Sequence, residues 1–556
     1  MYGTIQLHGG KLMIHINVYA DEIDNENKII PFYSTQFIPG DIIYIPDKTL
    51  YSRIEQPAVA IVVNIEIDYA ILHIATLPSC PFSPTIKNNK VKKGDRLVVW
   101  LRSNGQIDIV EIYPDHPTSD AICLRRVYEL CQPRPLLSST VDEPLYTRHD
   151  CVDHTDLNTF TIDPPESVDF DDAISVDVEK KMIYVHIVDI AHATLSVEER
   201  QRLQNHCLTL YLANEVTDHL LDHVNASSTY SLLVGENRHV ITVCMKLQDT
   251  MIESYEIYKS IINVKRRYTY EEVERLLMMH TPSPALSFLH ELDKKRSSSI
   301  LYQLYLPSLR FRINEIGTID SVYLEEDNDA HRLVATAMIM TNMVVSKQLT
   351  HHGIVFPNRF HQTLHGMLPN QSMIRTHHKQ VDSFLWVKKY ARAYYALDEK
   401  GHFGLDIKEY VHFTSPMRRY ADVIIHRILA GERFSKEVLE DEIDWINRRA
   451  TLVKSIQSLY TKWKIGRYIQ TYQPKQTIWI TGVHKSGVSW YMPSYSLDGF
   501  AHVSTFEPKQ YWKWKEEEKT LSDSNSIDIK VGQSYVATRI MVTPYTYHVS
   551  ITIHIS

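Results

Sequence analysis

The stretch Thr161-Ile-Asp-Pro-Pro-Glu-Ser-Val-Asp-Phe-Asp-Asp-Ala-Ile-Ser-Val-Asp177 contains four closely spaced aspartates, Asp163, Asp169, Asp171 and Asp172. In an extended chain, Asp169 and Asp171 lie on one face, because side chains alternate along a strand. The Pro164–Pro165 pair forces a bend that can return Asp163 toward them. We therefore expect the four carboxylates to converge on one site.

A cluster of carboxylates requires a neutralising cation, because close carboxylates raise one another's pKa. Oxygen-only ligands suit magnesium or manganese, and not zinc or copper. A calcium loop of the helix–loop–helix type needs a ligand at its third position and a glycine at its sixth. Counting from Asp163, those positions hold Pro165 and Val168, so the pattern excludes such a loop. The aspartates alone therefore indicate a site for a hard cation.

The segments that follow the aspartates predict a rigid scaffold. The runs ISVDV (174–178) and MIYVHIVDI (182–190) read as the two strands of a hairpin closed by Glu179-Lys180-Lys181. An acidic surface turn is the alternative interpretation of the aspartate run, and this setting argues against it. We expect Asp189, inside the second strand, to support the site rather than to bind the cation.

A second motif begins at Ser415 and reads SPMRRYADVIIHRILAGE. Serine as the N-cap and proline at the first helical position together predict that a helix starts here. Apolar residues follow at helical spacing along one stripe, so this helix should pack on a core. The members of the stripe are Met417, Tyr420, Ala421, Ile424 and Ile428.

Two cations, Arg418 and Arg419, then fall in the first turn of that helix, where the helix dipole disfavours positive charge. An anion held between the arginines and the free backbone N–H groups would account for this placement, and a scissile phosphate is one such anion. An ordinary ion pair between Arg418 and Asp422, four residues apart, is the alternative. The motif by itself leaves both interpretations open.

The chain has 556 residues, which exceeds the size at which single hydrophobic cores stop growing, so several domains are expected. A Gly-Asp turn leads into a β-branched strand twice, at Pro39-Gly40-Asp41 and at Lys93-Gly94-Asp95. This repeat predicts two small β-barrels in tandem, with two unrelated hairpins as the alternative. A third β-rich module is predicted over 477–556, and helical patterns dominate from about 271 to 469.

Five-stranded OB barrels have this strand spacing, and they bind single strands on an aromatic and basic face. The segment Lys509-Gln-Tyr-Trp-Lys-Trp-Lys515 interleaves aromatic rings with cations, as such a face would. An ordinary solvated turn fits the segment equally well, because Glu516, Glu517 and Glu518 follow it directly.

Composition excludes several other classes of protein. Apolar residues make up 44% and charged residues 23%, the balance of a globular protein. The longest apolar stretch, 334–345, is too short to span a membrane, and the amino terminus lacks the order of a signal peptide. The six cysteines form no C-x-x-C pair, which favours reduced thiols and a cytoplasmic location, with the nucleus as the alternative. The net charge of −8 argues only weakly against nucleic acid, because a basic groove can lie within an acidic protein.

Taken together, TIDPPESVDFDDAISV and, about 250 residues later, HFTSPMRRYADVIIHR resemble the RNB catalytic domain of RNase II, RNase R and the exosome-associated exoribonucleases. Further phrases agree in the same order, and the resemblance covers roughly 150 to 470. These phrases are VHIVDIAH (185–192), GENRHVITV (235–243), EDNDAHRL (326–333) and GHFGLDIKEYVHF (401–413).

The resemblance implies a multidomain architecture. Two cold-shock-like OB domains would occupy 1–68 and 69–148, ahead of a mixed α/β RNB catalytic domain at 149–472. An OB domain of the ribosomal-protein type would follow at 473–556. These ranges agree with the β-rich modules predicted from the strand patterns.

The resemblance also implies roles for individual residues. All four aspartates match the family's magnesium-binding set, and Asp171 stands at the position most needed for cleavage, with Asp172 beside it. Arg418 matches the arginine that contacts the reacting phosphate, and Arg419 is expected to bind substrate next to it. Tyr211 resembles the aromatic residue that stacks on the terminal base, and Tyr270 resembles a ribose contact.

The implied activity is hydrolysis of single-stranded RNA from its 3′ end to nucleoside 5′-monophosphates. Two magnesium ions, with manganese as an alternative, would activate water and stabilise the leaving oxygen, while Arg418 offsets charge on the phosphate. We expect a monomer with no obligate protein partner. The alternative is a family member that has lost catalysis and only binds RNA.

Some positions depart from the family pattern. Ala335 and Thr336 stand where a Glu-Glu pair is usual, and one of those acids helps to read the 2′-hydroxyl, so strict preference for RNA over DNA is put in doubt. Gln457 stands where a helix glutamate is common. Two metal-like patterns are interpreted as structural: His361-Gln-Thr-Leu-His365 lacks the general base of a zinc peptidase, and the 149–154 cluster falls in a linker.

Overall fold

The computed structural model describes the following residues. Before residue 91 it describes 2–8, 11–17, 29–31, 42–44, 49–52, 56–66, 69–74 and 85–87. From 91 to 555 it describes the chain except at 103, 105, 116–118, 131–133, 191–194, 213–215, 219, 222–228, 298–303, 315–317, 363–375, 391, 399–400, 473–474, 510, 524–526 and 543–548.

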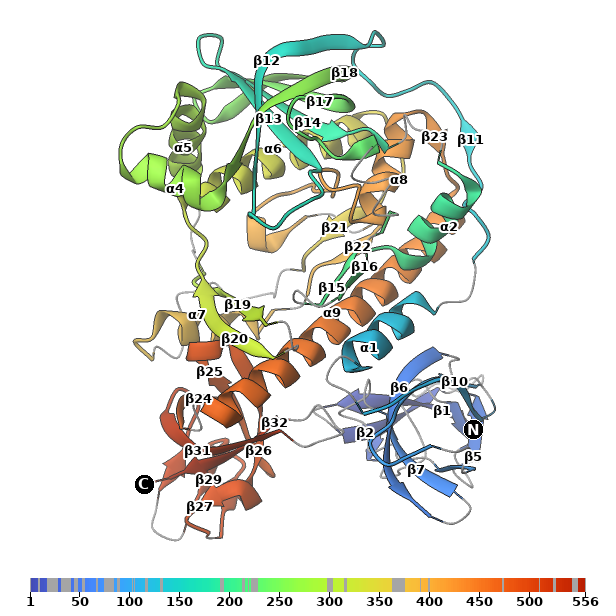
Figure 1. The fold of residues 1–556 in the computed structure, drawn as a ribbon, viewed down its shortest axis with the longest axis vertical. Helices are drawn as coiled ribbons and strands as arrows, with labels where there is room; N and C mark the ends of the chain where they lie inside the picture. The colour runs from blue at the N-terminus through green and yellow to red at the C-terminus, as the bar shows by residue number, and fades with distance from the viewer. Residues whose placement is uncertain are drawn as a thin grey trace.

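Two five-stranded antiparallel sheets form the N-terminal part of the chain (Figure 1). The first has the order β3-β2-β1-β4-β5, with β1 at Tyr2–His8, β2 at Lys11–Asn17, β3 at Ile29–Pro31, β4 at Ile42–Tyr44 and β5 at Thr49–Ser52. The second has the order β10-β9-β6-β7-β8, with β6 at Gln56–Ile65, β7 at Tyr69–Ile74, β8 at Thr85–Lys87, β9 at Arg96–Leu101 and β10 at Ile107–Tyr113. Two β-rich modules thus lie where two small β-barrels were predicted, and the closure of each sheet into a barrel stays a prediction.

The predicted boundary at residue 68 is wrong for β6. That strand pairs with β7 and β9 of the second sheet, and not with the first sheet. The turn at Lys93-Gly94-Asp95 leads into β9 as predicted, and Gly94 has a φ of 95°, which favours glycine. The equivalent turn at 39–41 lies outside the described residues. A helix, α1 at Ser119–Glu129, packs on β6 and β9.

A closed barrel forms the centre of the region that follows. Its strands are β12 at Val152–Asp163, β13 at Asp172–Asp177, β14 at Met182–Val188, β17 at Asn237–Gln248 and β18 at Met251–Thr269. The predicted hairpin is confirmed, because β13 and β14 are antiparallel and Asp177 lies opposite Met182 next to the turn. The barrel therefore holds both ends of the aspartate loop, at Asp163 on β12 and Asp172 on β13.

Helices and short strands make up the rest of this region. The helices are α2 at Val197–His206, α4 at Tyr270–Met278, α5 at Pro284–Ser297, α6 at Asp329–His351, α7 at Lys379–Val387, α8 at Tyr420–Leu429 and α9 at Lys436–Tyr472, with a 3-10 turn at Phe403–Leu405. The short strands are β11 at Thr140–Val141, β15 at Leu210–Leu212, β16 at Val216–Asp218, β19 at Ser308–Ile313, β20 at Ile319–Glu325, β21 at Asn358–Phe360, β22 at Tyr394–Ala396 and β23 at Glu432–Arg433. The predicted dominance of helices after about 271 is confirmed, although paired strands interrupt them.

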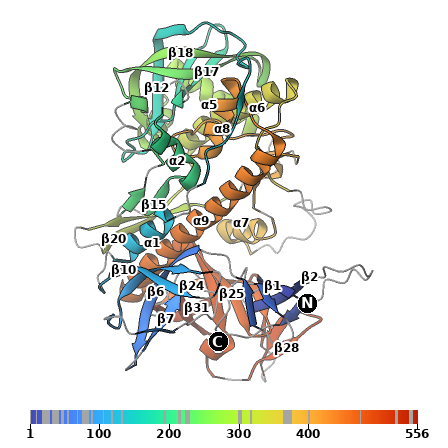
Figure 2. The ribbon, with the colours of Figure 1, turned by 90° about the vertical axis from the view of Figure 1, so that its right-hand side faces the viewer.

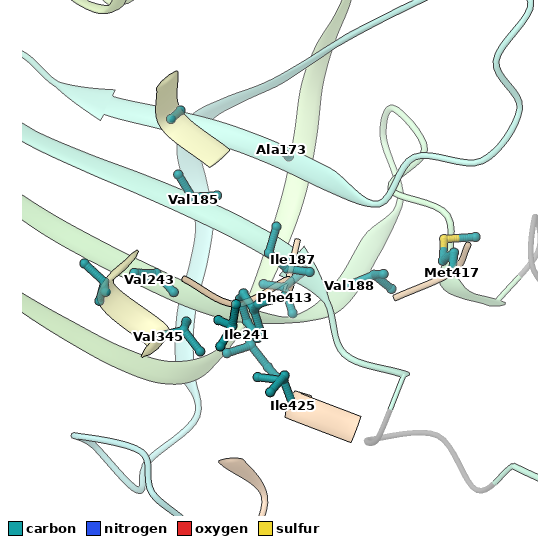
Figure 3. Close-up of a cluster of buried hydrophobic side chains, with 14 of the residues drawn as sticks. Ala173, Val185, Ile187, Val188, Ile241, Val243, Val345, Phe413, Met417 and Ile425 are labelled. Carbon is teal, nitrogen blue, oxygen red and sulfur yellow. The ribbon is translucent and has the colours of Figure 1, made fainter. Parts of the chain in front are cut away.

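The barrel is joined to helices α6 and α8 by a buried apolar cluster (Figure 3). Val185 and Ile187 on β14, with Ile241 and Val243 on β17, meet Val345 of α6 and Ile425 of α8. Each of these six side chains is at most 1% exposed. The stripe predicted on the second motif is likewise buried, so the prediction that this helix packs on a core is confirmed.

The long helix α9 runs from the barrel region to a C-terminal β module (Figures 1 and 2). Its 37 residues span roughly 55 Å at 1.5 Å per residue. The module has a six-stranded sheet, β26-β25-β24-β31-β32-β27, and a three-stranded sheet, β28-β29-β30. The strands are β24 at Gln476–His484, β25 at Gly487–Met492, β26 at Leu497–His502, β27 at Phe506–Glu507, β28 at Lys513–Lys515, β29 at Thr520–Ser522, β30 at Asp528–Ile529, β31 at Ser534–Val542 and β32 at Val549–His554, with 3-10 turns at Pro493–Tyr495 and Val503–Thr505.

Most of the 509–515 segment is used inside the C-terminal module. The Trp512 ring packs edge-on against Phe506, with centroids 5.5 Å apart. Lys515 pairs with Asp528 at 3.1 Å, whereas the Tyr511 side chain is 80% exposed. This arrangement favours the ordinary turn over a continuous stacking face. In the described part of the chain, no helix is long and apolar enough to cross a membrane.

A buried polar network lies on the other face of β14. His186, which is fully buried, bonds to the Ser175 hydroxyl through Nε2 at 3.0 Å and to the Thr242 hydroxyl through Nδ1 at 2.8 Å. Burial lowers the pKa of His186 to about 3, and the nearby ring of His154 adds to this effect. The imidazole is therefore neutral in the folded protein at neutral pH.

This buried histidine predicts a pH dependence of stability. In the unfolded chain His186 becomes protonated below about pH 6.5, whereas in the folded chain it stays neutral down to about pH 3. The stability that the neutral, buried imidazole contributes is therefore lost as pH falls below about 6.5. The wild type should lose about 2 kcal/mol more than His186→Gln between pH 8 and pH 5 in urea unfolding of the barrel region. His149→Gln, at an exposed position, is the control. A gap between wild type and His186→Gln that does not change with pH would contradict the assignment.

Candidate active site

The loop that carries the aspartates is held at its start by Arg267 of β18. One guanidinium nitrogen, Nη2, donates to the carbonyl oxygens of Pro164 at 2.8 Å and Pro165 at 3.0 Å. The guanidinium also lies 4.7 Å from the centroid of the Phe170 ring. Because β12 and β18 run parallel, with Asp163 opposite Thr269, Arg267 fixes the proline bend beside the strand end. Nothing in the sequence pattern singled out Arg267.

A serine holds the second half of the same loop. The backbone N–H of Phe170 donates to the Ser231 hydroxyl at 3.0 Å, and that hydroxyl donates to the carbonyl of Val168 at 3.1 Å. The Asp171 carbonyl accepts the N–H of Val188 at 3.0 Å. The backbone between 168 and 171 is therefore fixed on both sides, which orients the carboxylates of Asp169 and Asp171.

The two sequence motifs meet at Asp171. Its Oδ1 accepts the backbone N–H of Met417 at 2.8 Å, and its Oδ2 lies 3.3 Å from Nε of Arg418. The Arg418 Nη2 also donates to the Ser415 hydroxyl at 2.9 Å. The Asp171 side chain is 6% exposed and that of Arg418 is 48% exposed, so a buried carboxylate anchors an arginine that still faces solvent.

The predicted start of the second motif's helix is wrong. Helix α8 begins at Tyr420, residues 416–418 form a turn, and Arg419 is the N-cap residue with a φ of −138°. The cause is Asp422, whose carboxylate accepts the Ser415 N–H at 2.8 Å and both Arg419 Nε at 3.0 Å and Nη2 at 2.8 Å. These bonds hold the turn outside the helix.

Two consequences follow for the arginines. Neither lies in the first turn of a helix, so the argument from the helix dipole does not apply to them. The predicted alternative pair, Arg418 with Asp422, is also wrong, because Asp422 pairs with Arg419 and Arg418 pairs with Asp171. Asp422 is fully buried, which makes it the residue that positions the turn. It was considered from the sequence only as a partner of Arg418.

Burial and mutual repulsion hold three of the carboxyl groups at high pKa. Burial, with repulsion from the neighbouring Asp163 and Asp171, raises the pKa of Asp172 to about 8, although Arg418 and Arg419 lower it. Burial likewise raises the pKa of Asp163 to about 6, and that of Asp171 to about 6 despite Arg418 and the Met417 N–H. The local cations do not balance the carboxylates fully.

The donor set fits a hard divalent cation. All candidate ligands are carboxylate oxygens, and Asp163 Oδ2 is buried without accepting a hydrogen bond. Among the described residues, however, no three His, Cys, Asp or Glu side chains already converge as metal ligands. The expected convergence is therefore partial: Asp163 and Asp171 both act on the pKa of Asp172, and Asp169 lies on the same loop.

The two predicted tyrosines lie next to this cluster. The segment before Tyr211 pairs with the 415–419 turn, because the Thr209 N–H donates to the Arg418 carbonyl at 3.1 Å and Leu208 bridges to Arg419. The Tyr211 side chain, on β15, is 49% exposed. Tyr270 begins α4 directly after Thr269, which lies opposite Asp163, and its ring stacks on His331 with centroids 3.9 Å apart.

The departures from the family pattern lie on α6 and α9. Thr336 is buried and its hydroxyl donates to Asp293 at 2.8 Å, while Ala335 is exposed. Gln457 donates from Nε2 to the Tyr211 carbonyl at 3.2 Å, so it supports β15. In the 149–154 cluster, Asp150 pairs with Arg148 at 2.9 Å, which fits the interpretation as a linker. The second histidine of the 361–365 pattern lies outside the described residues.

Comparisons with known proteins agree on one family. The model of the RNB domain matches residues 151–431. Among curated relatives, Ribonuclease R of Chlamydia muridarum is 25% identical over 455 residues, covering 74% of this chain and 65% of the relative. Ribonuclease R of Aquifex aeolicus is 26% identical over 407 residues, covering 63% and 57%. The chain thus spans less than two thirds of the length of these relatives.

Solved structures share the fold over most of the chain. Mycoplasma genitalium RNase R, in complex with ribose-methylated single-stranded RNA, has a TM-score of 0.78 at 16% identity and covers 100% of both chains. Yeast Ssd1, described as a pseudonuclease, has a TM-score of 0.67 at 15% identity and covers 94% of this chain and 81% of its own. At these identities the likeness establishes the fold alone, a mixed α/β region flanked by β modules.

The raised pKa values predict that the aspartate cluster destabilises the metal-free fold. The pKa of Asp172 rises to about 8 on folding, so the fold favours the protonated carboxyl group. The stability that this group contributes is fully present below about pH 4 and is lost as pH rises through 8. In chelator at pH 8, Asp172→Asn should raise the free energy of unfolding by roughly 1–3 kcal/mol. Magnesium should then stabilise the wild type more than the variant, measured by thermal melting.

The matched control is Glu179→Gln in the exposed hairpin turn, which should melt as the wild type does in both conditions. If Asp172→Asn is less stable than the wild type in chelator, or if magnesium shifts both melts equally, the cluster is not a repulsive cation site.

Proposed function

The chain belongs to the RNB family, and we propose that it is a 3′-to-5′ exoribonuclease that hydrolyses single-stranded RNA to nucleoside 5′-monophosphates. One observation carries this proposal: a buried acid, Asp171, anchors Arg418 so that its guanidinium stays half exposed. An arginine fixed beside a carboxylate cluster suits phosphodiester cleavage, because the arginine can bind the phosphate while the acids hold cations.

Arg418 would stabilise the reacting phosphate. Its Nε and Nη2 are held by Asp171 and Ser415, which leaves its remaining N–H groups for the phosphate oxygens. A guanidinium that is already held in place before the substrate arrives loses little conformational entropy when the phosphate binds. Its interaction with the phosphate is also stronger at a partly buried site than in water. Arg419 is bonded twice to Asp422, so we propose that it positions the turn and does not itself bind substrate.

Asp163, Asp169, Asp171 and Asp172 would hold magnesium or manganese. When bound, two such ions supply an activated water and offset charge on the leaving oxygen. The carboxyl groups of Asp163, Asp171 and Asp172 must lose their protons to bind a cation, so the raised pKa of these three groups makes cation affinity increase with pH. Asp171 has a double role, since it also fixes Arg418.

The tyrosines would hold the strand itself. Tyr211, half exposed on β15, is placed to stack on a base, which every base allows because each has a flat face. Tyr270 has one ring face covered by His331, which leaves its other face or its hydroxyl for a ribose. Both contacts require an unpaired strand. We expect the protein to act as a monomer, without an obligate protein partner, in the cytoplasm.

The alternative is an RNB protein that binds RNA without cutting it. The structural likeness to the pseudonuclease Ssd1 makes this a real competitor. The presence of all four aspartates and of Arg418 argues against it, because a protein that only binds RNA has no use for a buried, mutually repelling acid cluster.

The activity is tested with single-stranded RNA and DNA of one sequence, labelled at the 5′ end, in magnesium or in chelator. We expect the 5′-labelled RNA to shorten progressively, with 5′-monophosphates as products and no reaction in chelator. DNA should react more slowly than RNA. The ratio of the two rates gives the preference for RNA, which Ala335 and Thr336 are expected to weaken. Internal cuts would contradict the proposal, and RNA binding without cleavage would establish the alternative.

The role of Asp171 is tested by Asp171→Asn. Removing one ligand and the anchor of Arg418 should lower kcat by about 10³-fold or more. The affinity for single-stranded RNA, measured by fluorescence anisotropy in chelator, should change by less than roughly a factor of ten. Asp177→Asn, at the far end of the same strand β13, is the matched control and should retain activity. Cleavage retained in Asp171→Asn would remove this residue from the mechanism.

A further inference from the structure

Three cations lie on adjacent elements in the middle of the molecule, and we name them the basic strip: Arg359 on β21, Arg392 just before β22 and Lys454 on α9. Strands β21 and β22 are paired, with Arg359 directly opposite Tyr395. The Arg359 guanidinium lies 4.7 Å from the centroid of the Tyr395 ring. Arg392 and Lys454 are exposed, and Arg359 is half buried.

Helix α9 brings Lys454 to the same place. Asn447 of α9 bonds both backbone groups of Tyr395, donating to its carbonyl and accepting its N–H, each at 2.9 Å. Lys454 lies seven residues further along α9, which is two turns on the same face. One turn further, Gln457 bonds the carbonyl of Tyr211 on β15. The strip therefore lies where α9 packs on β22, one turn of α9 before its contact with β15, the strand that carries Tyr211 (Figure 1).

The strip is also linked to the candidate active site. The Tyr395 hydroxyl bonds to Nδ1 of His412 at 2.8 Å, and His412 lies three residues before the turn that begins at Ser415. Burial lowers the pKa of His412 well below its usual value, and positive charge on Arg419 and Arg359 lowers it further. Arg359 of the strip and Arg419 of the active-site turn thus both lower the pKa of His412, which places the strip and the turn close together.

The strip carries positive charge that none of the acids in the described part of the chain neutralises by an ion pair. Asp398, the acid that follows β22, pairs with Lys436 at 2.8 Å. Burial lowers the pKa of Lys454, and Arg392 and Arg359 lower it further. Like charges gathered in this way are unfavourable until an anion binds among them.

We propose that Arg359, Arg392 and Lys454 bind backbone phosphates of the substrate strand, upstream of the phosphate held by Arg418. The spread of the cations over three elements fits a polyanion better than a single small anion, because each cation can meet a separate phosphate. The exposed ring of Tyr211 beside the strip provides a base-stacking surface on the same path. This inference rests on the proposed function, because it assumes that a nucleic acid strand reaches Arg418.

The test compares two double variants of the full chain. Arg392→Gln with Lys454→Gln removes two exposed cations of the strip, and Lys180→Gln with Lys246→Gln removes two exposed cations near the β13–β14 turn. That turn lies five residues from Asp172, roughly 17 Å along the strand. A third variant adds Arg359→Gln to the strip pair. Binding of labelled single-stranded RNA is measured in chelator, where no hydrolysis occurs, across a range of salt concentrations.

The salt dependence gives the number of phosphates that are lost. For single strands the slope of log affinity against log salt is about 0.7 per phosphate, so the strip pair should lower the slope by about 1.4 and the triple variant by about 2. The affinity for a long strand should fall by roughly tenfold near 0.1 M salt, whereas the control pair should keep the wild-type slope. Melting curves show whether each variant is folded.

Hydrolysis separates this site from the catalytic one. A dinucleotide joined by a single phosphate would bind Arg418 through that phosphate and would have none left to reach the strip. The strip variants should therefore lower kcat/KM for a long RNA about tenfold relative to kcat/KM for the dinucleotide. An unchanged salt slope, or an equal loss for long and short substrates, would overturn the inference. A wild type that binds RNA but hydrolyses none would refute the proposed function, and the binding arm would still decide the role of the strip.

Discussion

The structure depends on several carboxylates held at one point, of which Asp171 is buried and Asp163, Asp169 and Asp172 are half buried, with only part of their charge balanced. Asp171 is enclosed by a backbone N–H and a guanidinium that come from a turn 246 positions further along the chain. The excess negative charge appears as a pKa of about 8 at Asp172. Because the carboxylates repel one another, they would move apart into solvent if the loop were free. The fold must therefore hold the loop in place.

Four sets of contacts hold the loop and the turn in place. Arg267 fixes the proline bend and Ser231 fixes the middle of the loop, each through backbone groups. Asp422 holds the opposing turn by accepting three hydrogen bonds. The apolar cluster between the barrel and α8 sets the distance between loop and turn, because close-packed side chains cannot slide (Figure 3). The chemistry is therefore positioned by residues that would touch no substrate.

Pattern and spacing predicted the parts of the fold that depend on local chain properties. The hairpin after the aspartates follows from alternation and a charged turn, and the buried stripe of α8 follows from helical periodicity. The start of α8 was mispredicted, because Ser415 and Pro416 carry a strong local signal that two other contacts override. The Asp422 carboxylate accepts the Ser415 N–H, and the carbonyl of Cys207, distant in sequence, accepts the Tyr420 N–H. The boundary of the second sheet was missed because β6 pairs with β9, which lies far along the chain. Arg267 was missed because its partners are carbonyl groups, which leave no mark in a sequence.

The central claim is that Asp163, Asp169, Asp171 and Asp172 hold divalent cations beside Arg418. It is tested most directly by anomalous scattering from crystals of the chain soaked in manganese. The account predicts anomalous peaks within coordination distance of Asp163 and Asp172, facing Arg418. Manganese bound only elsewhere, with the aspartate cluster well ordered and free of any peak, would contradict it.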